Sequence, residues 1–152
     1  MSLVAVGAFY VDTILTPPHY PSEDEKLRAT SLSRRRGGNC PNSLEVLQQL
    51  TSPVRGSTEL DLVAVLPAHS SVAAWQIRAE LEPRVSLVQC IYREEFSEPA
   101  SSYIIKSLAS GSRTIVNYNE LPEMSVDEVK GVIDRVGESA GWFHFEVCAA
   151  GI

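Results

Sequence analysis

The sequence has few of the residues that hold metals or form disulfides. Its 152 residues include three cysteines, none of them in a CxxC pair, and three histidines that lie far apart. Zinc signatures bring their ligands close together in the sequence, so we expect no metal site held by protein side chains alone. Cysteines this sparse favour a reducing compartment, and therefore a cytoplasmic protein.

The sequence also lacks a basic excess and long apolar runs. Lysine and arginine total 13 against 19 acidic residues, which gives a net charge of −6. This balance argues against general binding of nucleic acid or of a membrane surface, because both need a basic face. No stretch is long enough to span a bilayer. Met1 is followed by strand-like apolar residues, not by the basic and apolar segments of a signal peptide.

What the sequence does contain is an alternation of apolar runs with amphipathic segments. Hydrophobic residues make up 44% of the chain, enough to build a core. Predicted strands cover residues 3–11, 61–66, 84–92 and 141–147. Predicted helices cover residues 42–50, 70–81 and 124–138. Ser125 and Glu128 form a capping box at the start of the last helix. This alternation predicts a mainly parallel sheet with helices on both faces.

Two segments do not fit the alternation. Residues 27–35 alternate loosely and predict a short exposed strand, and residues 101–119 predict two strands around a Ser-Gly-Ser turn. We expect both at an edge of the sheet or in a small separate sheet. Trp75 and Trp142 lie within apolar periodic runs, so we expect them in the core.

A glycine-rich turn leads into the first predicted helix. Gly37 and Gly38 allow a close backbone approach to a ligand. Asn39 and Asn42 can donate and accept hydrogen bonds, whereas an ionised Asp12 at the end of the first predicted strand can only accept. Ligands bind beyond the carboxyl ends of strands in open α/β sheets, so this set suits a polyhydroxylated ligand. The same residues also fit a structural role, with an asparagine capping the helix.

Several segments together resemble a known family. "VGAFYVDTI", "RRRGGNCPNSLEVLQQL" and "GSRTIVNYNELPEMS" resemble, in this order, segments of the PfkB-type (ribokinase-like) carbohydrate kinases, and most closely those members that phosphorylate fructose. The resemblance implies an α/β fold: the N-terminal half of a three-layer sandwich, with a mainly parallel sheet and a small β lid. Residues 27–36 and 101–119 match the lid. In fructokinase-like members the lid also packs against a second subunit. The resemblance therefore also implies a homodimer that forms through the lid.

The resemblance also implies roles for individual residues. The residues that match the family's sugar site are Asp12, Gly38, Asn39 and Asn42. Arg113 matches an arginine that assists phosphoryl transfer, and Glu146 matches an acidic residue near the nucleotide phosphates. ATP and Mg²⁺ are the implied cofactors and a small-molecule sugar is the implied partner. The implied reaction is phosphorylation of a sugar hydroxyl, of a ketohexose such as fructose.

The sequence has no GAGD turn, which carries the family's general base and anion hole, and neither GxxxxGK[ST] nor GxGxxG. Val147 and Cys148 also stand where fructokinase-like members have glycine and arginine. We therefore expect residues 1–152 to be a partial domain without the C-terminal nucleotide-binding half, and inactive alone. Two alternatives remain: a non-catalytic sugar-binding or regulatory module, and a relative that acts on a nucleoside.

Overall fold

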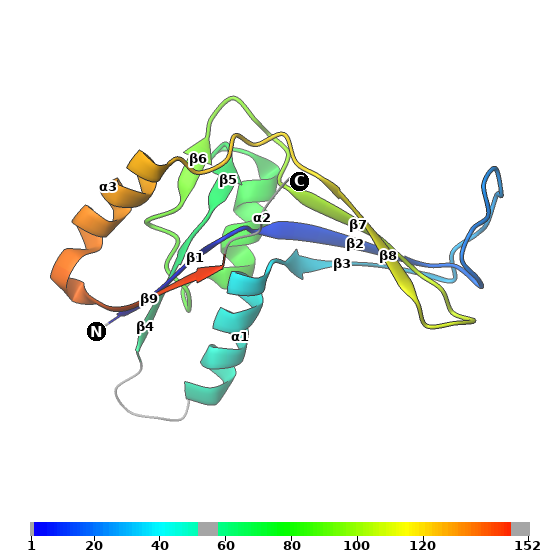
Figure 1. The fold of residues 1–152 in the computed structure, drawn as a ribbon, viewed down its shortest axis with the longest axis horizontal. Coiled ribbons are helices and arrows are strands. Elements are labelled where there is room, and N and C mark those ends of the chain that lie inside the picture. The colour runs from blue at the N-terminus through cyan, green and yellow to red at the C-terminus, as the bar shows by residue number, and fades with distance from the viewer. Residues whose placement is uncertain (1, 52–57, 147–152) are drawn as a thin grey trace.

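The computed structural model describes residues 2–51 and 58–146 (Figure 1). The substitutions noted at Val147 and Cys148, and the end of the last predicted strand, lie outside these residues. No helix within them is long and apolar enough to cross a membrane.

The main sheet has three parallel strands in the order β4-β1-β9. β1 spans Ser2–Gly7, β4 spans Glu59–Val63 and β9 spans Ala140–Glu146. β1 occupies the centre, between a strand that follows it closely in sequence and one near the end of the chain. The predicted parallel sheet is therefore confirmed.

Helices cover both faces of this sheet (Figure 1). α1 (Asn39–Thr51) and α2 (Val72–Leu81) share one buried cluster with the sheet, and α3 (Val126–Val136) shares another. The first cluster includes Ala5, Leu44, Leu62 and Ile77, and the second includes Val4, Val6, Val63 and Val132. Alternate residues of β1 enter opposite clusters because side chains alternate along a strand. The fold is thus the predicted three-layer α/β arrangement.

A second sheet extends away from the helices (Figure 1). Its four strands are ordered β3-β2-β7-β8, with β2 and β7 parallel and the two outer pairs antiparallel. Its strands span Tyr10–Thr16 (β2), Ser31–Gly37 (β3), Ser101–Lys106 (β7) and Arg113–Tyr118 (β8). The expectation of a small separate sheet is correct, although the sequence did not indicate that β2 belongs to it.

The prediction of one strand over residues 3–11 is wrong. β1 ends at Gly7 and β2 begins at Tyr10, so the apolar run crosses from one sheet to the other. Phe9 lies between the two strands and is 3% exposed in the core. The break itself is therefore apolar, and the hydrophobic pattern continues through it unchanged.

The prediction of a strand over residues 84–92 is also largely wrong. Only β6 (Ile91–Arg93) is extended there, and it pairs in parallel with β5 (Val65–Pro67). Val85 and Leu87 are buried on either side of Ser86, which forms only an isolated parallel bridge with Asp61 of β4. The amide of Ser86 donates to the Leu60 carbonyl at 2.8 Å. Burial, and not regular pairing, explains the apolar character of this segment.

Trp75 and Trp142 are not core residues. Their side chains are 64% and 65% exposed, respectively. Val72 on α2 is likewise 73% exposed, so the buried face of α2 is formed by Ala74, Ile77 and Leu81. A short 3-10 helix, η1 (Gly137–Ser139), connects α3 to β9.

Candidate functional site

The two glycines at the end of β3 are required by the packing around them. A Cβ on Gly37 would lie 2.7 Å from Cγ of Asp12, closer than real Cβ atoms come. Gly38 has φ of +96°, and a Cβ there would collide with the carbonyl oxygen of Ala8. The turn therefore brings the backbone against Asp12 and against the β1–β2 connection. α1 begins directly after it, at Asn39.

Asp12 is 8% exposed on the face of the four-stranded sheet that Gly37 packs against. Arg35 is directly opposite Asp12 in the β2–β3 pairing. Its Nε lies 3.5 Å from Oδ2 of Asp12, which compensates the charge of the carboxylate. The sequence analysis missed Arg35 as a site residue. Arg35 could have been recognised by pairing residues 27–36 antiparallel to the end of the first predicted strand, which places it opposite Asp12.

Asn39 and Glu146 meet although 107 residues separate them. Nδ2 of Asn39 donates to Oε1 of Glu146 at 2.7 Å. The other Glu146 oxygen lies 3.5 Å from Nε2 of His144. Phe143 and Phe145 stack on each other with ring centroids 6.1 Å apart. The start of α1 is thereby tied to the carboxyl end of β9.

A cavity of about 220 Å³ opens beside this contact, at the carboxyl ends of β1 and β9. Its polar lining includes Glu146, Asn119 and Glu123. Tyr10 also lines it and, two residues before Asp12 on β2, shares the face of that carboxylate. Neither Asp12 nor Asn39 lines this cavity: Asn39 is connected to it by the hydrogen bond to Glu146, and Asp12 lies two residues along β2 from Tyr10. Asn119 and Glu123 follow β8 within the segment "GSRTIVNYNELPEMS", but nothing in that segment singled them out as site residues.

The structure does not bring Asn42 and Arg113 to this cavity. Asn42 lines a different cavity, of about 520 Å³, with Trp142 and His144 between α1 and β9. Arg113 lies at the hairpin end of β8, four residues from Asn117. Asn117 is level with Asp12 through the strand pairings. At about 3.3 Å per residue, Arg113 is roughly 13 Å farther along the sheet.

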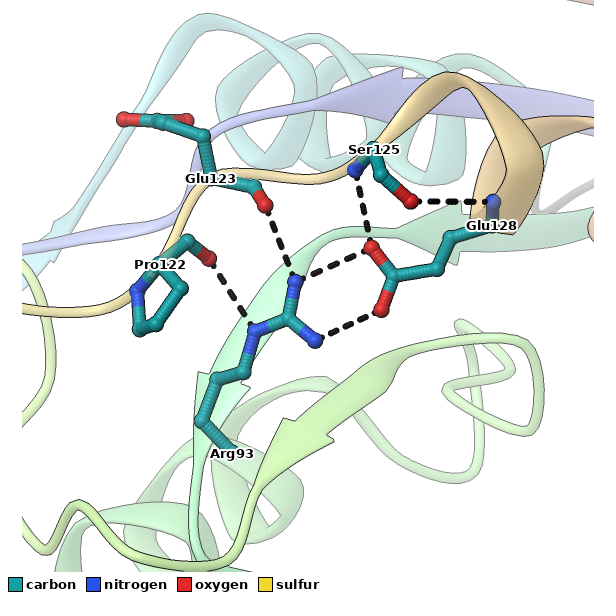
Figure 2. Close-up of polar contacts among 5 residues, drawn as sticks. All are labelled: Arg93, Pro122, Glu123, Ser125 and Glu128. Atoms are coloured by element: carbon teal, nitrogen blue, oxygen red, sulfur yellow. Dashed lines mark hydrogen bonds and ion pairs between the residues drawn. The ribbon is translucent and has the colours of Figure 1, made fainter.

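One wall of the cavity is held by Arg93 (Figure 2). Its guanidinium donates to the carbonyls of Pro122 and Glu123 at 3.0 and 2.9 Å. It also forms a bidentate pair with the Glu128 carboxylate at 2.6 and 3.0 Å. These bonds from Arg93, with the Ser125 amide, lower the pKa of Glu128 to about 2. The clamp fixes the segment that carries Glu123 into the cavity lining.

The structure describes no group of three or more histidine, cysteine or acidic side chains that could hold a metal ion in residues 2–51 and 58–146. Cys90 donates its thiol to the Leu62 carbonyl at 3.2 Å. Burial raises the pKa of this thiol to about 12, so it is unreactive as a nucleophile.

Comparisons with known proteins agree with this architecture. The chain is 30% identical over 146 residues to ketohexokinase of Mus musculus, covering 95% of this chain and 45% of that protein. No family model matches the chain. The predicted resemblance to the PfkB-type carbohydrate kinases is confirmed. The chain spans less than half the length of this relative.

Solved structures show the same fold. Phosphofructokinase-2 of Escherichia coli, solved with fructose-6-phosphate, aligns with a TM-score of 0.66 and 14% identity over 95% of this chain and 45% of that one. Ribokinase of Cryptococcus neoformans, solved with ADP, aligns with a TM-score of 0.60 and 17% identity over 82% and 39%. The predicted ribokinase-like fold is thus confirmed over the part that the chain spans. The roles of individual residues stay predictions.

Proposed function

We propose that the chain forms the sugar-binding part of a kinase that phosphorylates a hydroxyl of a ketohexose such as fructose, with ATP as the donor. The observation that supports this proposal is the glycine turn, which packs against Asp12 and leads into Asn39, whose amide donates to Glu146 in the lining of the cavity at the strand ends. The 30% sequence identity to ketohexokinase of Mus musculus supports a ketohexose as the substrate class. A cytoplasmic location and a homodimer through the four-stranded sheet, acting as the lid, belong to the same proposal.

The chemistry of phosphoryl transfer asks mainly for positioning and charge stabilisation. Asp12 accepts hydrogen bonds from the sugar hydroxyls, and the ion pair with Arg35 orients the carboxylate. Asn39 retains one N–H and its carbonyl oxygen for the sugar, because Glu146 takes the other N–H. The four-stranded sheet excludes water from the site, which prevents hydrolysis of the donor.

The nucleotide side of the site is proposed from resemblance. Glu146 would lie near the phosphates of ATP, and Arg113 would reach the transferred group only if the sheet moved toward the cavity. Mg²⁺ would accompany the nucleotide phosphates. The residues that the structure describes form no cluster of three metal ligands, so we assign no step to the ion.

Calorimetric titration tests sugar binding. We expect the chain to bind fructose more tightly than ribose or adenosine. Asp12→Asn should weaken fructose binding about tenfold or more, because a charge-assisted hydrogen bond is lost. Asp134→Asn, an exposed aspartate on α3, is the matched control and should bind as the unchanged chain does. Tighter binding of adenosine would favour the nucleoside relative, and no binding by any of the three would contradict the proposal.

A phosphate-transfer assay tests the proposal that residues 1–152 bind the sugar but lack the general base needed for transfer. With labelled ATP and fructose, residues 1–152 should form no sugar phosphate, since a general base typically supplies 10²- to 10⁴-fold in rate. A longer product of the same gene that carries a GAGD turn should transfer phosphate. Transfer by residues 1–152 alone would refute the partial-domain prediction. A gene without such a continuation would favour a non-catalytic sugar-binding module.

A further inference from the structure

A further cavity lies between α2 and the four-stranded sheet. It has a volume of about 310 Å³ and is lined by residues of β2, β3 and α2. Val11 and Arg34 both line it, and they alternate along their strands with Asp12 and Arg35, so the cavity lies on the face of the sheet opposite the Asp12 carboxylate. It is therefore distinct from the candidate sugar site, although Phe9 lines both cavities.

The floor of this cavity is apolar. Phe9 and Ile77 line it with exposed fractions of 3% and 2%, and Val11 packs against the same core cluster. The Trp75 side chain also lines the cavity and, as noted above, is largely exposed. Tryptophan is highly buried on average. An aromatic ring left open beside an apolar floor can cover the apolar part of a small ligand.

The rim of the cavity carries one unpaired charge of each sign. Arg34 on β3 and Glu80 on α2 both line the cavity, and both are exposed. In the part of the chain that the structure describes, they form an ion pair neither with each other nor with another side chain. Arg35 lines the cavity as well, but its guanidinium pairs with Asp12. The cavity therefore offers a donor for a carboxylate and an acceptor for an ammonium group.

We propose that this cavity binds a free α-amino acid with an apolar side chain, such as phenylalanine. The Arg34 guanidinium donates to the α-carboxylate of the ligand, and the Glu80 carboxylate accepts from its ammonium group. The apolar side chain of the ligand packs on Phe9 and against the Trp75 ring. The volume is at the lower end of small-molecule sites, which suits an amino acid better than a nucleotide. Such a ligand connects α2 to β3.

Calorimetric titration of the 152-residue chain with L-phenylalanine, N-acetylphenylalanine and phenethylamine tests the proposal. The second compound lacks the ammonium group and the third lacks the carboxylate. We expect L-phenylalanine to bind about tenfold more tightly than either analogue, because each analogue loses one charge-assisted hydrogen bond. Binding should also change the fluorescence of Trp75. The change should persist in Trp142→Phe, which removes the other tryptophan of the chain.

Variants of the two charged residues locate the site. Arg34→Gln and Glu80→Gln should each weaken the binding of L-phenylalanine about tenfold, and Arg34→Lys should restore most of the affinity. Arg28→Gln and Glu95→Gln change exposed residues outside the cavity. They are the matched controls and should bind L-phenylalanine as the unchanged chain does. All four positions are exposed, so we expect every variant to fold, which circular dichroism checks.

The remaining outcomes would overturn this inference. No binding of L-phenylalanine, or binding that neither Arg34→Gln nor Glu80→Gln weakens, would rule out the site. Equal binding of phenethylamine would show that no carboxylate is recognised, and equal binding of N-acetylphenylalanine would show that no ammonium group is. Either result would exclude an amino acid as the ligand. None of these variants changes a residue of the proposed sugar site, so a failure here would leave the proposed function standing.

Discussion

At the scale of single residues, Gly37 shows why a glycine pair precedes α1. We predict that Gly37→Ala lowers the free energy of unfolding by roughly 1–3 kcal/mol, the usual cost of forcing an extra carbon into a packed site. The added methyl would also displace Asp12, whose Cγ lies 2.7 Å from its position. Fructose binding should therefore fall with stability. Urea unfolding and calorimetric titration measure the two effects.

Gly131 in α3 provides the matched control. A Cβ there would meet only Nη1 of Arg135 at 3.4 Å, the end of a flexible side chain. Gly131→Ala should raise the free energy of unfolding by about 0.5–1 kcal/mol, because glycine is unfavourable inside a helix. If Gly37→Ala behaved in the same way, the close packing against Asp12 would play no part in stability.

The sequence predicted some residue positions and not others for physical reasons. Asp12 follows an apolar strand and the glycines precede a helix, which are ligand-binding positions in open α/β sheets, so their proximity could be predicted. Arg35 could not be assigned without the β2–β3 register. The exposure of Trp75 and Trp142 was missed because a short periodic run does not show which of its faces is buried.

At the scale of elements, the Arg93–Glu128 clamp joins β6 to the start of α3. The pKa of Glu128 is lowered from 4.5 to about 2 in the folded chain. Its contribution to stability is therefore complete above about pH 4.5 and is lost as the pH falls toward 2. Because Glu128 is partly exposed, we expect this contribution to be about 1–2 kcal/mol.

Urea unfolding between pH 7 and pH 3 checks this prediction. Glu128→Gln should lower the free energy of unfolding at pH 7 and flatten its decline below pH 4.5. Asp127→Asn removes a neighbouring carboxylate that is 94% exposed, and it should leave the acid profile as steep as in the unchanged chain. An equally steep decline in Glu128→Gln would show that other carboxylates cause it.

Elements that begin at a recognisable sequence signal, such as a capping box, were predicted well. α3 begins one residue after Ser125, as the capping box indicated. β6 was predicted poorly, because Val85 and Leu87, buried beside an isolated bridge at Ser86, leave the same apolar pattern as a full strand. The division of residues 2–16 between two sheets also leaves no local trace, since Phe9 at the break is as apolar as its neighbours.

At the scale of the whole molecule, one face of the four-stranded sheet is apolar and exposed. It lies opposite the face of Asp12 and presents Leu15, Leu32, Tyr103, Val116 and Tyr118, between 38% and 61% exposed. Exposed apolar patches of this kind mark interaction surfaces. We predict that the chain self-associates through this face.

Sedimentation velocity tests this prediction. Val116→Lys should weaken self-association about tenfold or more, because it places a charge directly opposite Tyr103 in the patch. Val88→Lys changes a valine that is 82% exposed outside the patch, and it should sediment as the unchanged chain does. Loss of association in Trp142→Lys instead would locate the contact at β9, the edge of the main sheet.

The fold class could be predicted from the sequence, because alternating strands and helices leave few other arrangements. The meeting of Asn39 with Glu146 could not, because no local pattern connects residues 107 positions apart. The same holds for the placement of β2 beside β7, which decides which residues share the face of Asp12.

The central position of β1 has a consequence for the order in which the chain can fold. β1 spans residues 2–7 and one of its two neighbours, β9, spans residues 140–146, so β9 is synthesised long after β1. Until then one side of β1 has no partner strand. Folding that depends on such distant pairing is slow, so the centre of the main sheet stays incomplete until the whole segment from β1 to β9 has been synthesised.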